Sequence, residues 1–116
     1  MKNESKPARE AGLSFGIGES VPAAAGFLRL PLRGHLDAEG APVLSQRLAG
    51  LLDAGSTRIE LDFAAVQFIS STGIGTLIAA VGDYRDVGGD IVITGLSKEL
   101  RDVFVMLDLV DYITLR

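Results

Sequence analysis

The hydrophobic positions of this chain follow two different spacings along its length. Leu13, Phe15 and Ile17 occur at every second position, which predicts a short strand. A second strand is predicted over residues 27–32, with its end near Pro31, because proline removes a ladder hydrogen bond. Alternation of this kind is typical of strands with one buried face.

Three later segments have the spacing of amphipathic helices instead. The first helix is predicted to begin at a cap, Asp37, and to end at Gly55. The second follows a run of hydroxyl residues and ends at Gly88-Gly89, and the third is capped by Ser97. Their predicted buried stripes are Leu44, Leu48, Leu51 and Leu52; Ile74, Leu77, Ile78 and Val81; and Leu100, Val103, Phe104 and Leu107.

Strands are predicted between these helices, at residues 58–63 and 91–93, and a closing strand is predicted after the third helix, at residues 112–115. The resulting order, β-β-α-β-α-β-α-β, is typical of an α/β fold in which helices pack against a mixed, mostly parallel sheet. Residues 1–10 are charged and are predicted to form a flexible arm, which leaves residues 11–116 as one domain.

Composition narrows the classes of function. The chain has 116 residues, no cysteine and one histidine, which excludes disulfides, cysteine-ligated metals and multi-histidine sites. Its net charge is −4, with the acidic excess after Arg58, which argues against binding to nucleic acid or to an anionic membrane. No apolar run reaches the length of a membrane helix and no signal peptide is visible, so we expect a cytoplasmic protein.

Ser70, Ser71 and Thr72 form a run of three hydroxyl residues between a predicted strand and a predicted helix. One hydroxyl suffices to cap the helix, so two are expected to be exposed at the end of the sheet, where such folds meet ligands and partners. A free hydroxyl at a helix N-terminus is a candidate phosphate acceptor, because the helix dipole tolerates an anion there. Capping remains the alternative role for each of the three.

Other features of the chain suggest other kinds of site. Gly73-Ile74-Gly75 is not a dinucleotide fingerprint, because the third glycine position is Ile78. A small hydrolase using Ser71, His35 and Asp37 would lack the GxSxG nucleophile elbow. Three aspartates along and beyond the second helix lack calcium-loop spacing and are expected to form a solvated acidic face: Asp83, Asp86 and Asp90.

Several segments, taken in order, resemble the STAS domains, a family that includes the bacterial anti-sigma factor antagonists. The resemblance covers about residues 11–116 and centres on two motifs. These are GHLD at residues 34–37 and FISSTGIG at residues 68–75, where the family commonly has a hydrophobic pair, Asp-Ser, a small residue and Gly-hydrophobic-Gly. It also includes residues 41–48, 59–62, 88–89, 91–93 and 100–109.

The resemblance implies a protein that acts by binding and has no enzymatic activity or cofactor. In the family, the unphosphorylated antagonist binds a serine-protein kinase of the histidine-kinase ATPase type, which often doubles as an anti-sigma factor. Phosphorylation of the loop hydroxyl releases the kinase, and a PP2C-type phosphatase reverses the modification. Ser71 is the first choice of acceptor and Thr72 the second, while Ser70 replaces the commoner aspartate.

The implied partner surface surrounds the start of the second helix. It comprises Ser70, Gly73, Ile74, Gly75, Thr76, Asp37 and Asp83. The alternative is a constitutive STAS accessory subunit of another complex, such as a lipid-transport ATPase, in which the hydroxyls would be structural. A weak homodimer through the edge strand near Leu13 is a further possibility.

Overall fold

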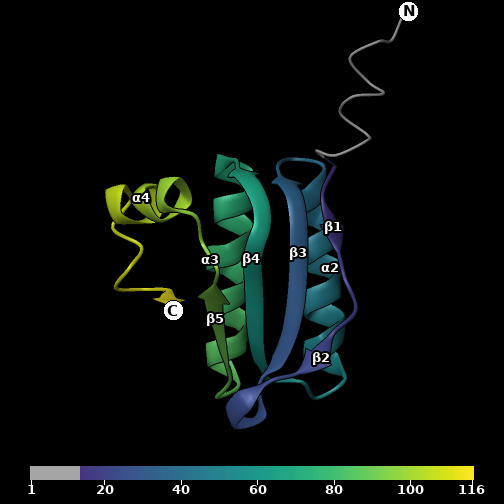
Figure 1. Cartoon of the computed structure of the whole chain (residues 1–116). Helices are drawn as coiled ribbons and strands as arrows, with labels where there is room; N and C mark the ends of the chain where they lie inside the picture. Colours follow the sequence, from purple (N-terminus) through teal and green to yellow (C-terminus); the bar gives the residue numbers. More distant parts are fainter. Residues whose placement is uncertain (1–13) are drawn as a thin grey trace, which may run out of the picture.

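A six-stranded sheet forms the centre of the computed structural model, which describes residues 14–116 (Figure 1). The main strand order is β1-β3-β4-β5-β6; β3 to β6 pair in parallel, and β1 and β2 pair antiparallel to β3. The predicted α/β fold is therefore confirmed. The elements are β1 (Gly16–Ile17), β2 (Val21–Pro22), the 3₁₀ turn η1 (Ala24–Gly26), β3 (Leu28–Leu36), α2 (Gly40–Asp53), β4 (Arg58–Ile69), α3 (Ser71–Asp86), β5 (Asp90–Thr94), α4 (Lys98–Met106) and β6 (Thr114–Leu115).

Helices α2 and α3 lie side by side against one face of the sheet, and α4 lies beyond β5 (Figure 1). The core fills the space between the sheet and these helices, and its largest fully buried side chains include Phe63, Tyr84 and Phe104. On the opposite face, Arg29 pairs with Glu60 at 2.9 Å. The alternation of buried and more exposed residues along β3, and along β4 as far as Phe63, thus separates a buried face from a more polar one.

Pro31 does not end its strand, contrary to the sequence-based prediction. β3 continues through it to Leu36, so His35 lies in the strand and not in the turn that follows. The carbonyl of Pro31 accepts a hydrogen bond from the Gly18 amide at 2.8 Å. The N–H and C=O of a strand residue point to the same side, so the nitrogen of Pro31, which carries no hydrogen, faces β1 and β2. The pairing of β3 with these two short strands is interrupted at Pro31, and no ladder hydrogen bond is lost there.

The remaining differences concern the ends and faces of elements. β4 extends to Ile69, beyond the predicted end at residue 63, and β6 is shorter than the predicted strand at residues 112–115. Leu13, in the first predicted strand, lies outside the described residues. Ile78 and Leu107 are exposed, and Ala80 and Tyr84 take part in the buried face of α3. The predicted glycine terminators are confirmed, because Gly55 and Gly88 both have the positive φ that glycine adopts without strain.

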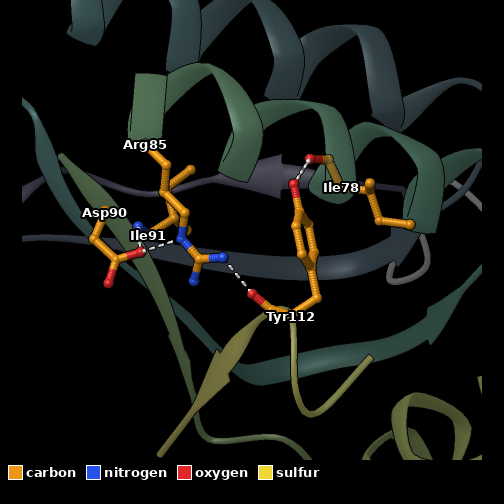
Figure 2. Close-up of polar contacts among 5 residues, drawn as sticks. All are labelled: Ile78, Arg85, Asp90, Ile91 and Tyr112. Atoms are coloured by element: carbon orange, nitrogen blue, oxygen red, sulfur yellow. Dashed lines mark hydrogen bonds and ion pairs between the residues drawn. The ribbon is translucent and has the colours of Figure 1, made fainter. Parts of the chain in front are cut away.

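Arg85 links the last turn of α3 to the start of β5 and to the C-terminal segment (Figure 2). Its guanidinium contacts Asp90 at 3.2 Å and donates to the Tyr112 carbonyl at 2.6 Å, and it lies 5.2 Å from the centre of the Tyr112 ring. The Tyr112 hydroxyl in turn donates to the Ile78 carbonyl. Within residues 14–116, no helix has the length and apolar content needed to span a membrane.

Candidate functional site

The run of hydroxyl residues lies where β4 ends and α3 begins. Because β3 and β4 are parallel, their carboxyl ends meet at the same edge of the sheet. The Ser70 amide donates to the Leu36 carbonyl at 2.9 Å and so ties the loop to the end of β3. The loop therefore lies at the edge of the sheet where ligands and partners meet α/β folds.

Ser70 is the residue that caps α3. Its Oγ accepts a hydrogen bond from the Gly73 amide at 3.1 Å, and its carbonyl accepts one from the Ile74 amide at 2.9 Å. Ser71 and Thr72 form the first helical positions and are both exposed. The structure thus leaves these two hydroxyl groups at the surface, as the count of three hydroxyls against one cap predicts.

The glycines of the loop serve two different purposes. A Cβ on Gly73 would lie 2.5 Å from the Leu36 carbonyl oxygen, so this glycine lets α3 approach β3. Gly73 and Ile74 are buried, so these two members of the implied partner surface lie beneath the surface of the loop. Gly75 is exposed, and a Cβ there would meet no atom within 4 Å.

Thr76 and Asp83 lie on the side of α3 that faces α2. Together with Thr72 and Gly75 they line a groove of 620 Å³ between the two helices. The α2 side of this groove, which includes Ser45, Ala49 and Asp53, was not predicted from the sequence. Their spacing of four residues was a usable signal, because it places them on one helical face beside the leucine stripe.

The prediction that the first helix begins at a cap at Asp37 is wrong in position, because α2 begins at Gly40 with Glu39 in the cap position and Asp37 lies two residues before that cap. Its Oδ1 accepts hydrogen bonds from the amides of Glu39 and Gly40, at 3.1 and 3.0 Å, and its carbonyl accepts one from Ala41. The His35 ring packs against Phe68, with 5.4 Å between the ring centres. Through these contacts Asp37 and His35 stabilise the structure around the loop. None of these contacts involves the Ser71 hydroxyl, so none of them activates it for nucleophilic attack.

The three aspartates of the predicted acidic face separate into two groups. Asp83 and Asp86 are exposed on α3, whereas Asp90 is half-buried and accepts hydrogen bonds from Arg85 and from the Ile91 amide. The prediction of a solvated face is therefore wrong for Asp90. No group of three or more potential metal ligands occurs among residues 14–116.

A family model described as "Mlab, STAS domain" matches residues 21–115. The chain belongs to the STAS domain family. BtrV of Bordetella bronchiseptica, named as a candidate anti-sigma factor antagonist, is 32% identical over 79 residues, which is 68% of each chain. The anti-sigma-B factor antagonist of Bacillus subtilis is 27% identical over 86 residues, 74% of this chain and 78% of that protein.

The same fold occurs in solved STAS structures. The Bacillus cell fate determinant SpoIIAA, solved in its phosphorylated form, superposes with a TM-score of 0.65 at 19% identity, over 89% of this chain and 91% of the other. At 19% sequence identity, the structural likeness to SpoIIAA shows the fold alone. The match to the family model confirms the resemblance to STAS domains, and the structural likeness confirms the fold that this resemblance implied.

The cap of α3 in this STAS domain makes a measurable contribution to stability. Replacing Ser70 by alanine is expected to lower the free energy of unfolding by about 1 kcal/mol, because the Gly73 amide loses its acceptor. Ser97→Ala should cost a similar amount, since its Oγ accepts from the Leu100 amide in the same geometry at 3.2 Å. Urea denaturation measures both effects. Ser71→Ala is the matched control, and an equal loss for that variant would contradict the assignment of the cap.

Proposed function

We propose that this STAS domain is a phosphorylation-controlled anti-sigma factor antagonist. In its unphosphorylated form it binds a serine-protein kinase of the histidine-kinase ATPase type that is also the anti-sigma factor, and phosphorylation releases that partner. A PP2C-type phosphatase restores the binding form, and the exchange takes place in the cytoplasm. The observation that carries the proposal is the exposure of Ser71 and Thr72 while Ser70 alone caps the helix.

The position of the two hydroxyl groups suits a reversible modification. A phosphate adds a charge of about −2 at neutral pH. At the first turn of a helix this charge is stabilised by the helix dipole and by free backbone N–H groups. Because neither Ser71 nor Thr72 is buried, the modified domain should stay folded. The modification would therefore change what the surface binds and leave the fold intact.

The energy required for such a switch is small. A tenfold loss of affinity corresponds to about 1.4 kcal/mol. Burying a phosphate against a surface fitted to a neutral hydroxyl can cost several kcal/mol, through desolvation and bulk. One modified hydroxyl at the centre of an interface is thus sufficient to release a partner.

Two relatives and one solved structure support the proposal. BtrV and the Bacillus subtilis protein carry names that place them as anti-sigma factor antagonists, and SpoIIAA has been solved in a phosphorylated form. The loop departs from the commoner family pattern at Ser70, where aspartate is usual. Here Ser70 performs the capping that an aspartate also performs, so the replacement leaves the start of α3 intact.

Mass spectrometry with fragmentation, on protein from its native cells, tests the proposal. We expect a gain of one phosphate, localised to Ser71 or Thr72 and absent from the matching alanine variant. The purified kinase and ATP should produce the same modification and abolish binding of the kinase. The double alanine variant should bind the kinase permanently, because it cannot be released.

The second candidate is a constitutive accessory subunit of another complex. It is favoured by the description of the matching family model, which names Mlab, and by the absence of the aspartate before Ser71. Under this alternative, no phosphate would be found in any growth or stress condition while a partner stayed bound. That result would contradict the switch and leave Ser71 and Thr72 with a structural role.

A further inference from the structure

The groove between α2 and α3 starts at the hydroxyl run and leads away from it. Both helices follow parallel strands and run away from the carboxyl edge of the sheet, so Thr72 lies at one end of the groove and Asp53 and Asp83 at the other. From Thr72 to Asp83 the groove is roughly 16 Å long at the rise of an α-helix, which matches about three turns of a docked helix.

The walls of the groove allow a close approach. Each helix contributes a small residue at two successive turns, namely Ser45 and Ala49 on α2 and Gly75 and Ala79 on α3. The floor between them is apolar and includes Leu48 and Ala80. A groove with low walls and an apolar floor fits the apolar face of a helix.

The charge of the groove is one-sided. Asp53 and Asp83 are its charged lining residues, and no lysine or arginine of the described part of the chain lines it. Both carboxylates are exposed at the end remote from Thr72. A segment that fills this groove therefore contacts an apolar floor along its length and two carboxylates at one end. This arrangement favours a partner with a basic residue at the end that lies beside Asp53 and Asp83.

We propose that the α2–α3 groove receives an amphipathic helix of the anti-sigma factor, with a lysine or arginine that pairs with Asp53 and Asp83. This inference rests on the proposed function for the identity of the partner. It also distinguishes the two hydroxyls, because Thr72 lines the groove and Ser71 does not. A phosphate on Thr72 would enter the space of the docked helix, whereas one on Ser71 would act at the rim.

Filling the groove tests the docking site. Gly75→Leu would project a side chain into the groove from a position where a Cβ meets no atom within 4 Å. Gly50→Leu is the matched control, because Gly50 is also an exposed helical glycine with open space around it but does not line the groove. With the purified anti-sigma factor, we expect binding at least tenfold weaker for Gly75→Leu and unchanged for Gly50→Leu. Equal affinity of both variants and the wild type would overturn the proposal.

Charge reversal tests the chemistry of the occupant. Asp83→Lys should weaken binding at least tenfold, and Asp86→Lys, on the same helix but outside the groove, less than threefold. Reversal of one basic residue on the partner's helix to glutamate should restore the affinity for Asp83→Lys. Equal losses for the two aspartate variants would show a general charge effect and overturn the basic-helix assignment. Circular dichroism establishes that all variants are folded.

Crosslinking separates this inference from the function on which it rests. Benzoylphenylalanine at position 79, introduced in native cells, should form a crosslink to a basic helix of the anti-sigma factor. Binding of that protein without a crosslink at position 79 would overturn the groove while leaving the proposed function standing. A crosslink to a basic helix of another kind of protein would support the groove and contradict the proposed partner.

Discussion

Replacing Gly73 by alanine should lower the free energy of unfolding by about 2–3 kcal/mol, the upper part of the usual cost of overpacking. The added Cβ would lie 2.5 Å from the carbonyl oxygen of Leu36 and 2.9 Å from Leu36 Cγ. That carbonyl accepts the hydrogen bond from Ser70 that joins β3 to the loop, so it cannot move without loss of the bond. The helix must therefore shift away from the sheet, and the shift disturbs the loop that carries both candidate acceptors.

The matched control is the other glycine of the motif. Gly75→Ala introduces a methyl group into open space and improves the helix propensity, so it should raise stability by about 0.5–1 kcal/mol. Urea unfolding of both variants measures the difference. Two substitutions of the same kind, two residues apart, are thus expected to have opposite signs. A stable Gly73→Ala variant would show that the contact with Leu36 is more yielding than the structure implies.

Stability should fall at alkaline pH because of Tyr84. Its side chain is 1% exposed and its hydroxyl donates to the Leu48 carbonyl at 2.6 Å. Burial raises the pKa of Tyr84 from 10.0 to about 12. The raised value means that the folded state holds the proton more tightly than the unfolded state. The resulting stabilisation is complete below pH 10 and is lost as the pH rises to 12, a change of about 2–3 kcal/mol.

Tyr84→Phe tests this assignment. The variant should lose about 1 kcal/mol at neutral pH, the net contribution of one hydrogen bond, and should show a smaller fall in stability between pH 10 and 12. Tyr112→Phe removes the other tyrosine hydroxyl of the chain, which is on an exposed residue, and should keep the alkaline fall. Denaturant titrations across this pH range measure both. An unchanged alkaline fall in Tyr84→Phe would assign the effect to another group.

Local patterns in the sequence were sufficient for the order of elements and for the chemistry of the loop. Helical stripes, the cap at Ser97, and the terminators Gly55 and Gly88 depend on neighbours within a few positions. The structure confirms the cap and the terminators, and it confirms the stripes apart from Ile78 and Leu107, which are exposed. The same reasoning predicted that the hydroxyl run contains two more hydroxyls than a cap requires. Periodicity, capping and turn geometry depend on residues that are close together in the sequence. They can therefore be predicted from the sequence when the fold is unknown.

Contacts between distant segments decided the rest. Pro31 stays within a strand because the preceding strands β1 and β2 leave its nitrogen at an interrupted edge. Gly73 is buried because the end of β3 lies against the start of α3. The groove exists because the parallel strands place α2 and α3 side by side. This arrangement brings Ser45, Ala49 and Asp53 of α2 opposite α3. Such contacts depend on which surfaces the folded chain brings together. Spacing along the sequence can mark one face of a helix, as it does for Ser45, Ala49 and Asp53, but it does not show which surface that face meets.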